Sequence, residues 1–167
     1  MLRKIFITLA VMLLGMGVDA LAQSPTAQMF VTARVYKAIT VLNTRELTFG
    51  RLAVGTNGGT VTISNNGVRS FTNDIVLVTS TYNSAQISIN GEGEMPITIT
   101  MNDVINLSDG NSHELELDLT ASELIGQIIL LNEAGVLTVN VGGTVTIPPG
   151  SPVGTYTGTV NFSVVYF

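Results

Sequence analysis

The chain lacks the residues on which most catalytic and metal sites depend. Its 167 residues include no cysteine, no tryptophan and a single histidine. Without cysteine there is no disulfide, no thiolate nucleophile and no Cys-based zinc site. His113 is accompanied by neither a G-x-S-x-G elbow nor an H-E-x-x-H motif, and one histidine is too few for a typical transition-metal centre. The sequence therefore predicts a protein that is not an enzyme and holds no cofactor.

Charge is also sparse. Charged residues make up 11% of the chain, with 7 Lys and Arg against 12 Asp and Glu and a formal net charge of −5. Nucleic-acid binding requires a basic patch, and no such patch is present, while the aromatic residues lie within apolar patterns. The polar positions are filled instead by Thr, Asn and Ser. We therefore expect no nucleic-acid partner.

The one long apolar run lies at the N-terminus. Two basic residues precede the uncharged stretch Ile5–Val18, and Ala20 and Ala22 follow in the small-x-small pattern of a cleavage site. The run is short for a membrane span of about 20 residues, and no basic stop-transfer flank follows it. We expect a signal peptide over residues 1–22, export to the cell surface or periplasm, and no transmembrane segment after its removal.

An alternating segment follows the predicted signal peptide. From Met29 to Leu42 the chain reads MFVTARVYKAITVL, in which successive residues point to opposite faces of a strand. Lys37 interrupts the apolar face, which indicates either a kink or two strands end to end. We therefore divide the exported chain into an N-terminal segment, residues 23–37, and a β-sandwich domain, residues 38–167. Four apolar residues share one face of the segment: Met29, Val31, Ala33 and Val35.

The rest of the chain is dominated by period-2 alternation, which predicts an all-β fold with little or no helix. Glycine- and asparagine-rich turns, including one at Gly142–Gly143, separate the expected strands. We interpret Asn102–Asn111 as a loop, and Thr120–Leu131 as either a short capped helical turn or a buried strand. The expected strands are Leu47–Leu52, Gly59–Ser64, Ile75–Thr79, Ala85–Asn90, Ile97–Met101, Glu114–Leu119, Gly135–Val141, Thr144–Ile147 and Thr155–Tyr166.

One row of carboxylates is a candidate cation site. The stretch HELELDL places Glu114, Glu116 and Asp118 on one strand face and leucines on the other. Same-face neighbours on a strand are about 6.5–7 Å apart, whereas calcium takes about six to eight oxygens at 2.3–2.6 Å. We interpret the row as a solvated face over a leucine core, and whether it holds a cation stays open.

The C-terminal residues resemble the signature of pilus subunits that are assembled by the chaperone–usher route. That signature has a glycine fourteenth from the end, alternating apolar residues and a penultimate aromatic residue. The N-terminal TARVYKAITV also resembles the start of cysteine-free pilins. The matching C-terminal positions are Gly154, Tyr156, Gly158, Val160, Phe162, Val164 and Tyr166.

A second resemblance covers most of the exported chain. LTFGRLAVGTNGGTVTISNNGVRS together with GTYTGTVNFSVVY is similar to a family of secreted bacterial domains of unknown function, DUF4402.

These resemblances imply an immunoglobulin-like antiparallel β-sandwich that serves as a non-catalytic subunit of a surface fibre, with a Gram-negative bacterium as the expected source. The implied partners are further copies of the chain or related subunits, and a periplasmic chaperone. Met29, Val31, Ala33 and Val35 would then be donated to a neighbouring subunit. The alternative is a self-contained secreted or periplasmic β-sandwich, with Met29–Leu42 as its first strand and a bulge at Lys37, that binds a surface polymer, carbohydrate or protein.

Overall fold

The structure, a computed structural model, describes residues 25–167 of the chain. Over that range it contains twelve β-strands and no helix, as the alternation predicts. It follows that none of these residues belongs to a helix long and apolar enough to cross a membrane. The predicted signal peptide, residues 1–22, lies outside the described residues.

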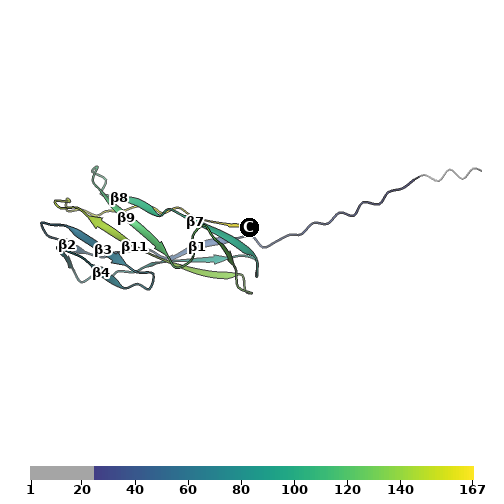
Figure 1. Ribbon diagram of the computed structural model, residues 1–167, viewed down its shortest axis with the longest axis horizontal. Coiled ribbons are helices and arrows are strands. Elements are labelled where there is room, and N and C mark those ends of the chain that lie inside the picture. The colour runs from purple at the N-terminus through teal and green to yellow at the C-terminus, as the bar shows by residue number, and fades with distance from the viewer. Residues whose placement is uncertain (1–24) are drawn as a thin grey trace, which may run out of the picture. The chain divides into compact units, whose positions relative to one another are not determined.

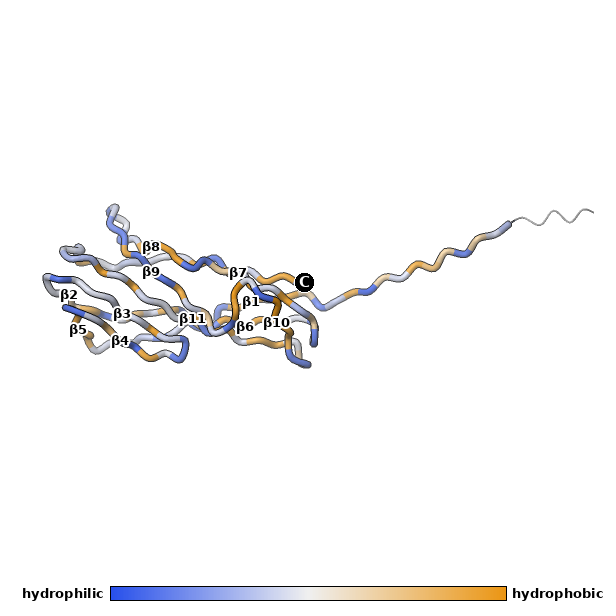
Figure 2. The backbone as a smooth tube through the Cα atoms, viewed as in Figure 1, coloured by the Kyte–Doolittle hydropathy of each residue, from blue (hydrophilic) through white to orange (hydrophobic). Residues whose placement is uncertain are grey.

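The chain divides into two units between Arg34 and Val35. In the first unit, residues 25–34 adopt neither helix nor strand, and Figure 2 shows apolar and polar residues following one another along them. In the second unit the first strand, β1, covers Thr40–Arg45. Of the alternative first strand Met29–Leu42, only Thr40–Leu42 forms part of β1, and residues 25–39 are assigned to no strand.

The larger of the sheets in the second unit has seven strands, all paired antiparallel (Figure 1). The strand order along its main path is β1-β6-β11-β3-β4. In addition, β9 pairs with β11, and β8 pairs with β9. After β1, its strands are β3 Gly59–Ile63, β4 Arg69–Phe71, β6 Ala85–Asn90, β8 Val104–Ser108, β9 Glu114–Ala121 and β11 Val136–Ile147.

Two smaller sheets complete the sandwich. The three-stranded sheet has β7 (Pro96–Met101) between β10 (Ile128–Leu130) and β12 (Phe162–Tyr166). A two-stranded sheet pairs β2 (Leu52–Val54) with β5 (Ile75–Leu77). All of these pairs are antiparallel.

The inward faces of the sheets form two apolar clusters. Ile89 of β6, Ile97 and Ile99 of β7 and Val139 of β11 have no exposed surface. Burying one such side chain contributes about 1.5–3 kcal/mol, so packing can stabilise the domain without disulfides. The first cluster contains Val61, Ile75, Leu115, Leu117, Val145 and Ile147, and the second contains Ile89, Ile97, Ile99, Leu131, Val139 and Val141.

Strand β11 corrects the prediction of two strands separated by a turn at Gly142–Gly143. The chain runs straight through both glycines, with β3 on one edge and β9 on the other. A Cβ on Gly142 would collide with the carbonyl oxygen of Ile63, and one on Gly143 would lie 2.6 Å from the carbonyl oxygen of Asp118. The glycines therefore serve close strand approach here and make no turn.

Strand β8 corrects the loop interpretation of Asn102–Asn111. Val104–Ser108 pairs along β9, so that Ile105 lies opposite Leu117. Ile105 packs against the first apolar cluster, and this tertiary contact outweighs the surrounding Asn and Asp residues. Within Thr120–Leu131, Ile128–Leu130 forms the strand β10. The expected burial of this strand is wrong, because Ile128 and Leu130 are both more than half exposed.

The C-terminal strand is shorter than the expected Thr155–Tyr166. Its ladder covers only β12, and Thr157 makes an isolated bridge with Ser108. The partner chain is interrupted at this point, because β7 ends at Met101 and β8 begins at Val104. The ladder of β12 therefore begins at Phe162, opposite Met101.

The other expected strands are found close to their predicted positions, except at Leu47–Leu52. Thr48 makes only an isolated bridge with Asn83, and β2 begins at Leu52. Strand β4 was not expected at all: Arg69–Phe71 is only three residues long and shows no alternation.

Candidate functional site: two free strand edges

Several strands among residues 25–167 end their sheets with one edge unpaired, and β1 and β12 are the two that lie close together. Within residues 25–167, β1 pairs only with β6, and β12 pairs only with β7. The second edge of each strand therefore presents backbone N–H and C=O groups with no ladder partner. Such edges are templates for pairing with another extended chain.

The two free-edged strands meet at one end through Tyr166. Its hydroxyl donates a hydrogen bond to the carbonyl oxygen of Lys37 at 2.7 Å and accepts one from the backbone N–H of Glu92 at 2.6 Å. The ring of Tyr36 lies 6.4 Å from the ring of Tyr166, centroid to centroid. The backbone N–H of Lys37 also donates to the Glu92 carboxylate at 3.1 Å. The start of β1 and the end of β12 thus lie side by side, although they belong to different sheets.

The apolar core is incompletely covered along these strands. Val41 of β1 lies opposite the fully buried Ile89, yet 39% of its surface is exposed. On β12, Phe162, Val164 and Tyr166 pack against the second apolar cluster and are only partly buried. A further apolar strand along this side would remove that surface from water.

The C-terminal signature residues alternate in burial. Tyr156, Val160, Phe162, Val164 and Tyr166 are partly buried, and the residues between them are exposed. The two signature glycines differ in their surroundings.

A Cβ on Gly158 would lie 2.8 Å from the side chain of Leu107, whereas one on Gly154 would meet nothing closer than Asp109 at 3.4 Å. Gly158 is therefore the more closely packed of the two, at the point where the chain passes close to β8.

The proposed donor residues are exposed. Met29, Val31 and Val35 are 84%, 80% and 92% exposed, and Ala33 is exposed as well. An apolar face of this extent in contact with water is unfavourable, and exposed apolar patches in soluble proteins often mark interaction sites. The alternating face therefore offers apolar surface that this chain does not bury.

Two groups near the turn between β8 and β9 have shifted pKa values. Hydrogen bonds from His113 and from the backbone N–H of Asn111 lower the pKa of Asp109 from 3.8 to about 2. Burial, and then the nearby charge of Asp109, raise the pKa of Tyr156. Asp109, Asn111 and His113 are thus joined by hydrogen bonds within the turn between β8 and β9.

The acidic row has the arrangement that the sequence predicts. Leu115 and Leu117 are buried, while Glu114, Glu116 and Asp118 are exposed. Across residues 25–167, no three His, Asp or Glu side chains are grouped closely enough to hold a metal ion. The row therefore has the geometry of a solvated strand face.

Sequence reasoning missed the partners of Tyr166. The penultimate tyrosine stood out as part of the signature, but its bonds to Lys37 and Glu92 span 129 and 74 residues. Lys37 was the one clue in the sequence. It interrupts the apolar face of the N-terminal segment, and its carbonyl oxygen is the atom that Tyr166 binds.

Comparison with protein families identifies a family for this chain. A family model described as "Domain of unknown function (DUF4402)" matches residues 39–166. No curated protein matches the chain. The matched range begins just before β1 and ends with β12, so it includes both free-edged strands and leaves out Met29, Val31, Ala33 and Val35.

Proposed function

We propose that this chain, which belongs to the family Domain of unknown function (DUF4402), is a pilin-like structural subunit of an exported surface fibre. Each subunit donates its exposed segment, residues 25–35, to the free edges of β1 and β12 in the next copy. The single observation that carries this proposal is that one chain contains both an exposed alternating apolar segment and two strands whose outer edges are free.

The chemistry of the segment fits those edges. A donated strand supplies backbone hydrogen bonds to the strands beside it, and every second side chain enters the apolar layer. Met29, Val31, Ala33 and Val35 have that spacing, and the partly buried Phe162 and Val164 line the layer they would enter. Burial of about four apolar side chains would contribute several kcal/mol.

Donation to a neighbour is favoured over insertion into the same chain. To fold back between β1 and β12, the segment would need a tight turn between Val35 and Thr40. The intervening residues, YKAI, contain no Gly, Pro, Asn or Asp, and these are the residues that tight hairpin turns require. Repeated donation from one copy to the next is a head-to-tail contact, which generates an open fibre.

The alternative is a self-contained secreted or periplasmic β-sandwich that binds a surface polymer, carbohydrate or protein. The observation in its favour is that β1 already pairs with β6 in the same chain, at the edge of a sheet whose core residues are fully buried. In that case the protein is a stable monomer and residues 25–35 are a tail.

Deletion of residues 23–34 separates the two functions. This deletion keeps Tyr36 and Lys37, and with them the contacts of Tyr166. We expect the full chain to form fibres, seen by electron microscopy and light scattering, and the deletion variant to stay monomeric while retaining its β-rich circular dichroism. Fibres formed by the deletion variant, or a full chain that is a stable monomer with reversible cooperative unfolding, would contradict the proposal.

A matched pair of substitutions locates the effect on one face. Val31→Asp places a charge on the donated apolar face, whereas Thr32→Asp places the same charge on the opposite face. Burying an unpaired carboxylate is costly, so Val31→Asp should abolish fibres and Thr32→Asp should retain them. Equal loss with both variants would show that the segment acts through its charge and does not insert as a strand.

A further inference from the structure

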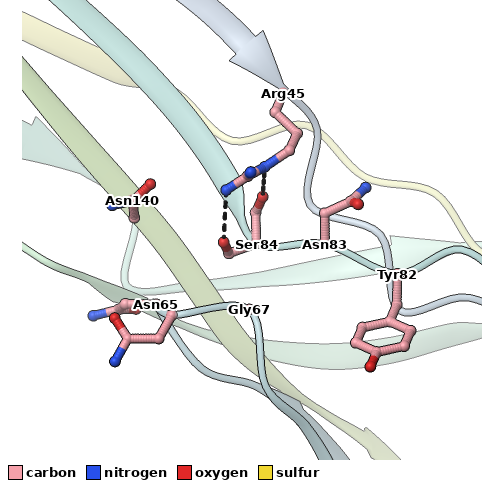
Figure 3. A pocket seen from close by; sticks show the side chains of 8 residues that line it. Arg45, Asn65, Gly67, Tyr82, Asn83, Ser84 and Asn140 are labelled. Atoms are coloured by element: carbon pink, nitrogen blue, oxygen red, sulfur yellow. Dashed lines mark hydrogen bonds between the residues drawn. The ribbon is translucent and has the colours of Figure 1, made fainter.

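A polar recess lies at the far end of β1 from Tyr166. It has a volume of about 400 Å³, and Arg45, Asn65, Asn66, Tyr82, Asn83 and Asn140 contribute most of its lining (Figure 3). These residues come from the end of β1, the turn after β3, the segment leading into β6 and the middle of β11. We call this hollow the amide recess, after its four asparagines.

The base of the amide recess is fixed by Arg45. Its Nε donates to the carbonyl oxygen of Ser84 at 2.7 Å, and its Nη2 lies 3.1 Å from the Ser84 hydroxyl, as the dashed lines of Figure 3 show. Ser84 itself is 1% exposed. The guanidinium is therefore held in one orientation by a buried group, and a ligand would meet a preorganised donor.

The asparagine side chains have donor and acceptor groups that make no hydrogen bond within the described residues. Asn65 uses its carbonyl oxygen to accept from the backbone N–H of Gly142, and Asn140 uses its own to accept from Gln86. In both residues the NH₂ group remains as a donor. The side chains of Asn66 and Asn83 make no hydrogen bond with any residue in the part of the chain that the structure describes. The recess thus offers neutral amide donors and acceptors from several directions.

An aromatic ring stands at the side of the amide recess. The Arg69 guanidinium lies 4.2 Å from the centroid of the Tyr82 ring and donates to the carbonyl oxygen of Phe49. This cation–π contact holds the ring in place. Tyr82 is still 41% exposed, so part of the ring is available to an apolar ligand face.

The composition of the lining selects a class of ligand. No carboxylate lines the amide recess, which disfavours a divalent cation. A single guanidinium is fewer cations than phosphate sites usually gather. Neutral amides, one fixed arginine and an aromatic ring match a ligand with many uncharged hydroxyls and an apolar C–H face. We propose that the amide recess binds a neutral saccharide, an activity that does not depend on strand donation.

The test uses the full chain and saturation-transfer NMR. The probes are three neutral trisaccharides, namely maltotriose, cellotriose and chitotriose, with sialyllactose as an anionic comparison. We expect at least one neutral probe to receive saturation, with the weak affinity of about millimolar that a small open site allows. No transfer to any neutral probe at about 10 mM, or transfer to sialyllactose alone, would overturn the proposal.

Variants assign binding to the recess. Asn83→Asp keeps the side-chain shape and removes two N–H donors, and we expect about tenfold weaker binding. Tyr82→Ala should remove binding, while Tyr82→Phe, which keeps the ring, should retain it. Asn161→Asp, on the exposed C-terminal run away from the recess, is the matched control and should bind normally. Thermal unfolding establishes that each variant is folded, and unchanged affinity in folded Asn83→Asp and Tyr82→Ala would show that the recess is not the site.

Discussion

At the residue scale, Tyr166 connects parts of the sandwich that are remote in sequence. Its hydroxyl joins the residues before β1 to the loop after β6, and its ring packs against the second apolar cluster. The end of β12 is thereby held beside the start of β1, as the proposed strand donation would require.

Tyr166→Phe tests this connection. The substitution removes a hydroxyl that serves both the Lys37 carbonyl and the Glu92 N–H, so we expect the free energy of unfolding to fall by about 1–3 kcal/mol. Tyr156→Phe is the matched control, because that hydroxyl makes one bond, to the carbonyl oxygen of Pro152. Urea unfolding should show the larger loss for Tyr166→Phe, and equal losses would remove the special role of Tyr166.

The lowered pKa of Asp109, in the turn between β8 and β9, predicts that the stability of the fold depends on pH. Its pKa is lowered to about 2 in the folded chain, chiefly by hydrogen bonding with His113. A depressed folded pKa stabilises the fold above the ordinary value of 3.8, and this stabilisation is lost as pH falls from about 4 toward 2. Asp109→Asn should therefore lower the urea midpoint at neutral pH, and the difference from the unsubstituted protein should disappear near pH 2. A difference that persists unchanged at pH 2 would contradict this origin.

At the element scale, β11 organises the sandwich. It pairs with β6 along its first half and lies between β3 and β9 along its second half. The change occurs at Gly142 and Gly143, where neighbouring backbones approach too closely for a side chain. Glycine weakens an isolated strand, so its presence here reflects the requirements of the neighbouring strands.

Gly142→Ala should therefore destabilise the domain. The added methyl group would collide with the carbonyl oxygen of Ile63, and we expect a loss of about 1–3 kcal/mol from overpacking. Gly154→Ala is the control, since the new methyl would meet Asp109 only at 3.4 Å, and its effect should stay within about 0.5 kcal/mol. Thermal unfolding of both variants measures the two losses of stability. Equal losses would show that β11 can shift to accommodate the methyl group.

At the scale of the whole molecule, the chain combines an apolar segment with a sandwich whose edge is incompletely covered. Either feature alone would promote non-specific association, because exposed apolar surface and unpaired strand edges both attract other chains. In the proposed head-to-tail assembly, each would cover the other.

A peptide with the sequence of residues 25–37 provides a direct test. Added to the variant that lacks residues 23–34, it should raise the unfolding temperature, with a stabilisation of about 2.7 kcal/mol at a peptide concentration 100 times the Kd. The same peptide carrying Val31→Asp should have no effect. Stabilisation by both peptides, or by neither, would be inconsistent with insertion of the apolar face.

The sequence by itself determined the all-β class and the faces of individual strands. In HELELDL the leucines are buried and the acidic residues exposed, as alternation predicts, because period-2 patterning is a local property of a strand. The alternation of the C-terminal signature was visible for the same reason. Tertiary structure alone decided which strands pair, since ladder partners come from distant positions.

Residues Val104–Ser108 become β8 only because β9 lies alongside them, and Gly142–Gly143 are spanned by β11 because strands flank them on both sides. The candidate site depends on the same kind of information. Lys37 and Tyr166 are 129 residues apart in the chain, and only packing of the two sheets brings them into hydrogen-bonding contact.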